Sequence, residues 1–221
     1  MCGRFSLTIA ESQTILHRFG LKKIAVDLKP RYNIAPSQQI AVILNESSDI
    51  LTEARWGLIP HWAKDEKSSY TMINARAESI QEKPAYKEPF QHKRCLIVAD
   101  SFYEWNKNSK KPYRIMLQDE SLFSFAGIWD RRNTVTTCSI ITTTPNELMK
   151  NIHVRMPVIL PQENEKKWLS NITPEEALGM LKPYDAHHMK AYEISPLINS
   201  VKNESPEVLK TLAKSGLGEF I

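Results

Sequence analysis

Short apolar segments rich in β-branched and aromatic residues recur at close spacing through the middle of this chain. No long helical pattern separates them, and proline punctuates them, with 13 prolines against seven glycines among 221 residues. The segments that predict strands are 39–44, 94–98, 102–105, 113–117, 123–129, 135–143 and 156–160. Closely spaced strands pair antiparallel, because parallel neighbours need long crossover connections. The pattern therefore predicts an α+β fold, a single β-rich domain over residues 1–221 with mainly antiparallel strands and short peripheral helices.

Helix signals flank these segments. Thr8 and Glu11 have capping-box spacing, apolar residues recur on one helical face over 15–19, and Gly20 stands where a C-cap belongs. We expect a helix there. Further short helices are expected to begin at Pro161, Thr173 and Ser205.

Composition excludes several classes of protein. Hydrophobic residues at 42% and charged residues at 24% are ordinary globular values, which exclude a disordered chain. No apolar stretch approaches the roughly 18 residues of a membrane span, and the first residues lack a secretory signal, so we expect a cytoplasmic protein. The net charge of +4 favours an anionic partner without requiring one. Three cysteines without a C-x-x-C pair, and the lack of metal-site and phosphate-loop motifs, predict no metal and no cofactor.

Cys2 directly follows the initiator methionine. Removal of Met1 is expected before so small a residue, and it leaves a free α-amine beside the thiol. The reference pKa of an α-amine is about 7.7–8.0, so a useful fraction is neutral and nucleophilic. Such an amine forms a Schiff base with an aldehyde, and the thiol can then close a five-membered thiazolidine ring. Arg4 is expected to raise the thiolate fraction. The alternative is a residue without function near a frayed terminus.

Two titratable side chains lie in motifs suited to acid–base chemistry. Strand alternation puts Glu104 on the same face as Phe102, and a partly apolar face raises the pKa of a carboxyl group. The alternative is an edge-strand glutamate that faces water. His153 follows a predicted short helix over 145–150 and precedes Arg155, so an imidazole and a guanidinium could act together on a phosphate-bearing leaving oxygen. The alternative is an ordinary surface histidine.

Two further segments suit contacts with nucleic acid. If residues 74–76 are extended, Asn74 and Arg76 share a face that could contact sugar and phosphate. A helical conformation, with both residues on an exposed face, is equally compatible with the sequence. Trp56 is expected in the core, whereas an exposed Trp62 could stack on a base for about 1–3 kcal/mol.

Eight motifs occur in order along nearly the whole chain. They cover residues 1–5, 32–36, 55–60, 74–78, 94–97, 102–105, 153–157 and 199–201. Together they resemble the SRAP family (SOS response-associated peptidases, abasic site processing proteins). Two residues depart from the family pattern: Ser101 replaces the usual glycine before Phe102, and Val98 replaces a frequent proline.

The resemblance implies a function for the motifs. Cys2 would crosslink to an abasic site in single-stranded DNA, with His153 assisting sugar-ring opening, Glu104 deprotonating the Cys2 amine and Asn74 holding the sugar oxygens. The residues implied to contact DNA are Arg4, Arg76, Arg155 and Trp62. The resemblance also implies a nucleoid-associated monomer that needs no metal, cofactor or membrane.

Two other classes of function stay open at this point. One is a thiol peptidase that uses Cys2, Glu104 and His153 and releases its own Met1. The other is a non-catalytic binder of single-stranded DNA that uses basic and aromatic side chains.

Overall fold

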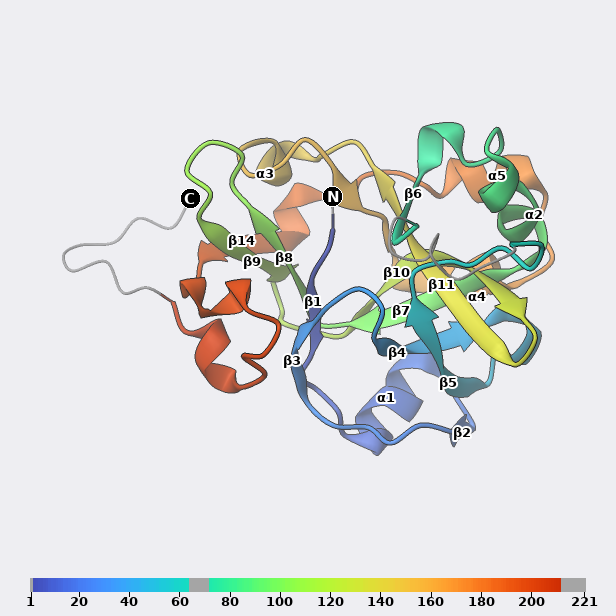
Figure 1. Ribbon diagram of the computed structural model, residues 1–221, viewed down its shortest axis with the longest axis horizontal. Coiled ribbons are helices and arrows are strands. Elements are labelled where there is room, and N and C mark those ends of the chain that lie inside the picture. Colours follow the sequence, from blue (N-terminus) through green and yellow to red (C-terminus); the bar gives the residue numbers. More distant parts are fainter. Residues whose placement is uncertain (1, 64–71, 212–221) are drawn as a thin grey trace.

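Strands dominate the computed structural model, which describes residues 2–63 and 72–211 (Figure 1). The smaller sheet has the strand order β14-β9-β8-β1-β3 and is antiparallel throughout. Its members are β1 (Phe5–Leu7), β3 (Arg31–Ile34), β8 (Ser101–Trp105), β9 (Pro112–Leu117) and β14 (Met189–Glu193). This sheet carries the N-terminal strand next to the strand that contains Glu104.

The larger sheet closes on itself. Its strand order is β12-β11-β10-β7-β4-β5-β2, and β11 also pairs with β5, so β5, β4, β7, β10 and β11 form a ring. Short β6 adds to β11, and β13 adds to β10. The bounds are β2 (Lys23–Ile24), β4 (Gln39–Leu44), β5 (Ile50–Trp56), β6 (Asn74–Arg76), β7 (Arg94–Ala99), β10 (Phe123–Arg132), β11 (Val135–Thr143), β12 (Met156–Pro157) and β13 (Ile159–Leu160).

The predicted strands and the β-rich α+β class are confirmed, with local exceptions. Segment 156–160 is divided into two short strands that pair with different partners. Three pairings are parallel, namely β2 with β5, β5 with β11 and β6 with β11. Residues 74–76 are extended, which settles the choice that the sequence left open.

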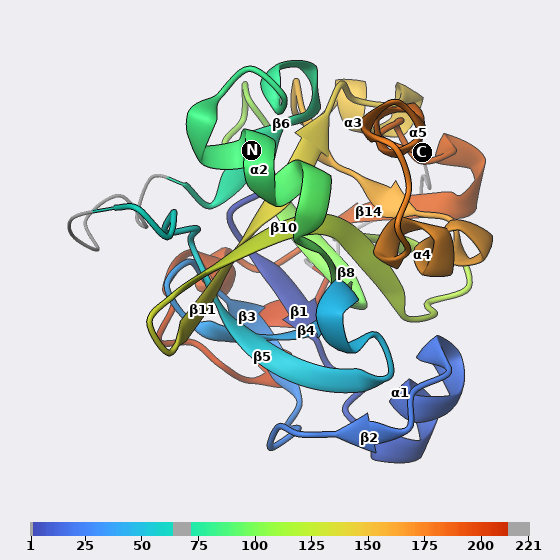
Figure 2. The same ribbon diagram turned by 90° about the vertical axis from the view of Figure 1, so that its right-hand side faces the viewer.

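Short helices lie around the sheets. They are α1 (Ser12–Phe19), α2 (Pro84–His92), α3 (Glu147–Lys150), α4 (Gln162–Leu169) and α5 (Pro174–Gly179), and residues 206–209 form a 3-10 turn. In Figure 2, α2 faces the viewer in front of β10, against which it packs. Within the described residues, no helix is both long and apolar enough to cross a membrane.

The signals at the ends of α1 have different outcomes. Gly20 adopts the left-handed conformation at φ 64°, which confirms the predicted C-cap. The predicted capping box at Thr8 is wrong, because the helix begins later and Glu11 is its N-cap residue. Thr8 donates its hydroxyl to Asp100 at 2.7 Å instead, so a tertiary contact takes the side chain that the local pattern assigned to the helix.

The predicted helix start at Thr173 is confirmed, and the capping box found there leads to a prediction. Thr173 Oγ1 accepts the Glu176 amide at 3.2 Å, and Glu176 Oε2 accepts the Thr173 amide at 3.0 Å. Thr173→Ala is expected to lower the free energy of unfolding by about 1 kcal/mol, because it leaves a helix amide without its acceptor. Urea unfolding measures this. A Thr134→Ala variant at the exposed tip of the β10–β11 hairpin serves as a control, and an equal loss in both would contradict the cap.

The core anchors the N-terminal strand. Phe5 of β1 packs edge-on against Trp56 at a centroid distance of 5.2 Å and against Phe125 at 5.8 Å. Trp56 is fully buried, as predicted. The chain just before β1 meets β6, because Asn74 of β6 donates to the Cys2 carbonyl oxygen.

Candidate functional site

Cys2 lies three residues before the start of β1 and is fully buried in the main hydrophobic cluster. This burial contradicts a frayed terminus at Cys2. The thiol lies 3.9 Å from the Arg4 carbonyl oxygen. Burial, and then the negative charge of Glu104, raise the pKa of the Cys2 thiol. The thiol is therefore protonated at neutral pH, and the expectation that Arg4 increases its thiolate fraction is wrong.

Asn74 holds the backbone of Cys2. Parallel pairing of β6 with β11 places Asn74 opposite Ile140, and only 8% of its surface is exposed. Its Nδ2 donates to the Cys2 carbonyl oxygen at 2.8 Å. Its Oδ1 is buried and accepts no hydrogen bond from any described residue, so it can accept one from a donor bound next to Cys2.

Glu104 is a buried carboxyl group on β8. Its exposed fraction is 3%, which contradicts the alternative of an edge-strand glutamate facing water. The predicted alternation of faces is confirmed, since Phe102 lies in the main core whereas Tyr103 lies in a second cluster on the other side. Burial raises the pKa of Glu104 to about 7. At neutral pH this carboxyl can therefore both accept and release a proton.

His153 lies in the loop between α3 and β12. The loop contacts the end of β8, because the Lys107 amide donates to the Ile152 carbonyl oxygen at 3.1 Å. His153 Nδ1 lies 3.1 Å from the Arg155 amide and 3.2 Å from the Arg155 carbonyl oxygen, so the neutral imidazole either accepts the amide and carries its proton on Nε2 or donates Nδ1–H to the carbonyl. Burial lowers the pKa of His153, which makes this neutral form dominant at pH 7.

Arg155 is engaged inside the protein. Its two terminal nitrogens bind the Glu78 carboxylate at 2.6 and 2.9 Å, and Nη2 also donates to the Thr142 carbonyl oxygen at 2.7 Å. The hydrogen bond from Arg155 lowers the pKa of Glu78. A bidentate pair of this kind is strong, and it fixes the loop that carries His153.

Arg4 is also engaged with its own chain. Its Nη1 donates to Asn33 Oδ1 at 2.5 Å and to the Ile198 carbonyl oxygen at 2.8 Å, and its guanidinium lies 5.8 Å from the centre of the Trp105 ring. Burial lowers the pKa of Arg4. The guanidinium is therefore directed toward the C-terminal segment rather than toward the thiol of Cys2.

Arg76 and Trp62 remain open to solvent. Arg76 ends β6, two residues from Asn74, is exposed, and forms no hydrogen bond or ion pair with a described residue. Trp62 is 59% exposed. Nothing in the described part of the chain joins Trp62 directly to Cys2, so it lies outside the central group.

Sequence reasoning assigned no role to Asn33, although it lies in one of the eight motifs. Asn33 is fully buried, and its Nδ2 donates to the carbonyl oxygens of Ser200 and Asn203 at 2.9 Å each. It thereby joins Arg4 to the C-terminal segment. The motif over residues 32–36 indicates that Asn33 belongs to the family pattern, but it does not predict the contact with the C-terminal segment.

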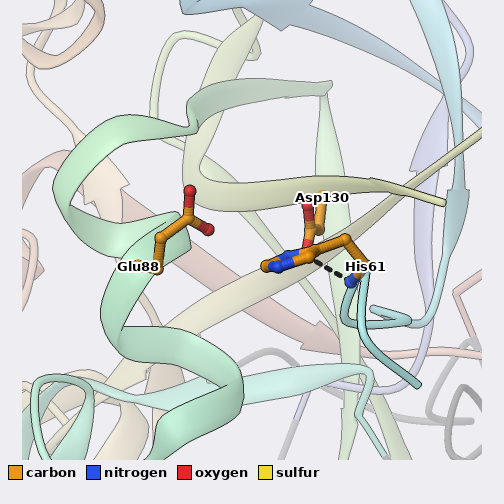
Figure 3. Close-up of side chains that lie close together, drawn as sticks. All are labelled: His61, Glu88 and Asp130. Atoms are coloured by element: carbon orange, nitrogen blue, oxygen red, sulfur yellow. Dashed lines mark hydrogen bonds and ion pairs between the residues drawn. The ribbon is translucent and has the colours of Figure 1, made fainter.

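A second group of titratable side chains lies apart from Cys2. Ligand atoms of His61, Glu88 and Asp130 lie within 4.8 Å of one another (Figure 3). Lys93 Nζ lies 2.8 Å from Asp130 and 3.1 Å from Glu88, so one ammonium group already binds both carboxylates and offsets one of their two charges. Burial favours a higher pKa of Asp130, but hydrogen bonds from Lys93 and from the amides of His61 and Arg131 hold it below its usual value. We interpret this group as an ion-pair network.

Comparisons with known proteins identify the family. The family model described as SOS response associated peptidase (SRAP) matches residues 1–201. Abasic site processing protein YoqW of Bacillus subtilis is 50% identical over 224 residues, which covers 96% of this chain and all of that protein. Abasic site processing protein HMCES of Gallus gallus is 31% identical over 82% of this chain and 66% of its own length.

A solved structure agrees with these relatives. The crystal structure of a protein from Bacteroides thetaiotaomicron superposes with a TM-score of 0.86 and 33% sequence identity, covering 95% of this chain and 99% of the other. The motifs around Cys2, Glu104 and His153 lie within the matched residues. The chain therefore belongs to the SOS response associated peptidase (SRAP) family.

Proposed function

We propose that this protein recognises abasic sites in single-stranded DNA and captures them covalently through Cys2 once Met1 has been removed. The names of its relatives support the abasic-site role, because proteins 31–50% identical to it are abasic site processing proteins. One observation carries the chemistry, namely that Glu104 is buried next to Cys2 and has a pKa of about 7. That value lies within about one unit of the α-amine reference of 7.7–8.0, so a proton passes between them at a cost of about 1 kcal/mol.

The first step of the proposed reaction is opening of the sugar. An abasic deoxyribose exists mainly as a closed hemiacetal, which hides its aldehyde. His153 is half-buried, and its protonated form donates a proton to the ring oxygen while water takes the proton of the anomeric hydroxyl, so that the ring C–O bond breaks and the aldehyde forms. Asn74 Oδ1 accepts a hydrogen bond from the sugar or from the Cys2 amine, which gives this buried atom the donor that it lacks.

Capture follows in two bond-forming steps. Glu104 removes a proton from the Cys2 ammonium, the amine attacks the aldehyde carbon, and loss of one water gives the imine. The Cys2 sulfur then bonds to the imine carbon while its proton moves to the nitrogen, which closes the thiazolidine. A protonated thiol suits this addition, because it supplies both the sulfur and the proton. The closed ring prevents the strand cleavage by β-elimination that an imine would support.

Intact-mass spectrometry tests this function. Met1-free protein is mixed with single-stranded DNA that carries one abasic site, and a heat-stable adduct of protein plus DNA minus one water is expected. DNA of the same sequence without the lesion is the control. No adduct with Met1 confirmed absent would exclude covalent capture.

The single-strand preference follows from access to Cys2. A lesion must leave the base stack to reach a buried residue, and this costs least where no complementary strand is present. We assign Arg76 to a backbone phosphate and Trp62 to a flanking base, because both side chains are exposed. Arg4 and Arg155 bind groups of the protein itself, so we assign them to holding the site in place and not to contacting DNA.

Arg76→Ala gives a test of the phosphate contact. It is expected to weaken binding of single-stranded DNA and to reduce the slope of log affinity against log salt by about 0.7, the value of one phosphate contact on a single strand. Fluorescence anisotropy at several salt concentrations measures the slope. Lys22→Ala removes an exposed charge next to α1, which lies at the bottom of Figure 1, away from β6, and is expected to change nothing. An unchanged slope in Arg76→Ala would exclude the contact.

The thiol peptidase reading fits this geometry less well. A cysteine peptidase needs a thiolate, which a neighbouring imidazolium stabilises. Burial and Glu104 favour the neutral thiol of Cys2, and burial favours the neutral imidazole of His153. Release of Met1 remains compatible with either reading, because it happens once and need not be fast.

A further inference from the structure

Asp100 is a buried carboxylate that the proposed reaction does not use. It lies between β7 and β8 and is 1% exposed. It accepts hydrogen bonds from Ser6 Oγ at 2.5 Å, from Thr8 Oγ1 at 2.7 Å, from the Ile9 amide at 3.1 Å and from the Thr8 amide. Its own amide donates to the Ser6 carbonyl oxygen at 3.1 Å. One side chain thus holds three residues of the N-terminal segment.

Ser101 extends this contact into a network. Its Oγ lies 2.5 Å from Ser6 Oγ and accepts the Arg114 Nε at 2.8 Å. Arg114 Nη2 lies 3.9 Å from Asp100. All four side chains are buried, so their hydrogen bonds have little competition from water. Ser101 is the residue that departs from the usual family glycine, and here its hydroxyl links the two strands.

The network lies where the strand pairing is short. Residues 5–6 of β1 lie opposite residues 101–102 of β8, next to each other in Figure 1. Continuing this register puts Gly3 opposite Glu104, and Cys2 follows next. A shift by one residue turns every side chain to the other face, and a shift by two moves Cys2 by about 7 Å. Either shift moves Cys2 away from Glu104.

We propose that Asp100, linked through Ser101 and Ser6, is a positioning residue that fixes the register of β1 against β8 and so holds Cys2 beside Glu104. This inference rests on the proposed function, because Cys2 and Glu104 must meet for capture. Pairing with β3 and the core packing of Phe5 also hold β1, and the Asp100 contacts extend this hold to Thr8 and Ile9. The carboxylate adds four hydrogen bonds to the N-terminal segment, and bonds to a charged acceptor are about twice as strong as neutral ones.

The test compares the rate of capture with DNA binding. Asp100→Asn keeps the shape but turns an amide donor toward backbone amides, and Thr8→Val removes one hydroxyl donor. At saturating abasic DNA we expect Asp100→Asn to slow capture by at least about tenfold, because misplacement by 1 Å can cost on the order of 10²-fold. Thr8→Val is expected to slow capture by about threefold. Affinity for undamaged single-stranded DNA is expected to stay within about twofold in both variants.

A matched control separates position from stability. Ser124→Ala, on β10, deletes another buried hydroxyl that donates to a carboxylate, in this case that of Glu165 on α4. It is expected to leave the capture rate unchanged at a temperature where every variant is folded. Hydrogen exchange of the amides in residues 4–7 is expected to accelerate in Asp100→Asn and Thr8→Val, and not in Ser124→Ala.

The outcomes distinguish the two proposals. Wild-type protein that forms no adduct contradicts the proposed function. Wild-type protein that forms the adduct, with unchanged rates in Asp100→Asn and Thr8→Val, contradicts the positioning role alone. Equal slowing by Ser124→Ala at equal loss of stability also overturns it. If Asp100→Asn does not fold, the Thr8→Val rate decides.

Discussion

Cys2→Ala is expected to abolish the covalent adduct with abasic single-stranded DNA. Alanine at this position keeps the free α-amine after Met1 removal but has no sulfur to close the ring, so any imine stays reversible. We expect the yield of heat-stable adduct to fall by at least about 10³-fold, since no other residue can supply the second bond. Denaturing electrophoresis after heating, checked by intact mass, measures this yield.

Two controls make the Cys2 result specific. Cys138→Ala removes another fully buried free thiol, which lies on β11, and this variant is expected to capture DNA at the wild-type rate. Cys2→Ser is expected to give an adduct only after borohydride reduction, because serine can form the imine but not the sulfur ring. A heat-stable adduct in Cys2→Ala without reduction would contradict ring closure and move the nucleophile elsewhere.

The sequence predicts the strands well because their signal is local. Apolar and β-branched residues recur within each strand, so β7, β8, β10 and β11 are recognisable from their own residues. Closure of the ring is different. The parallel pairing of β5 with β11 joins Arg55 to Thr137 across 82 positions, and no local pattern carries that contact. The same limit explains Thr8, which has the spacing of a helix cap and binds Asp100 instead.

The chemistry of the site is more predictable than its partners. Residue type alone indicates what Cys2, Glu104 and His153 can do, and the burial of Glu104 follows from its apolar strand. The partners of the arginines depend on tertiary contacts. Arg94 shows this most clearly, because its strand is predicted, yet its fully buried guanidinium donates to carbonyl oxygens at the ends of α2 and α4. A guanidinium in a sequence is equally compatible with DNA binding and with such an internal role.

Glu104→Gln is expected to slow capture and to remove the rise in rate centred near pH 7, which leaves only the rise at about 7.7–8.0 that comes from the Cys2 amine. Glutamine keeps the shape of the side chain but cannot take a proton from the Cys2 amine, a loss worth about 10²- to 10⁴-fold for a general base. In the wild type, the rate is expected to rise with pH through about 7, where Glu104 ionises. Single-turnover capture from pH 5.5 to 8.5 measures the profile. A Glu104→Gln variant with the wild-type profile would exclude this carboxyl as the base.

The same substitution is expected to stabilise the protein at alkaline pH. Burial raises the folded-state pKa of Glu104 from 4.5 to about 7, so the folded protein binds more protons than the unfolded chain between these values. Stability that is present below pH 4.5 is therefore lost as the pH rises through 7. Glu104→Gln avoids this loss. The difference in free energy of unfolding between the variant and the wild type is therefore expected to grow in favour of the variant by on the order of 3 kcal/mol between pH 4 and pH 8.

Glu78→Gln provides a control of opposite sign for this stability effect. The hydrogen bond from Arg155 lowers the pKa of Glu78, so its carboxylate stabilises the fold above the ordinary pKa and loses that effect as the pH falls. Glu78→Gln is therefore expected to be less stable than the wild type at pH 8, with the difference shrinking in acid. Urea unfolding at pH 4, 6 and 8 measures both variants. If the Glu104→Gln difference is the same at all three values, the buried carboxyl does not ionise near pH 7, and the proton transfer proposed for capture has lost its base.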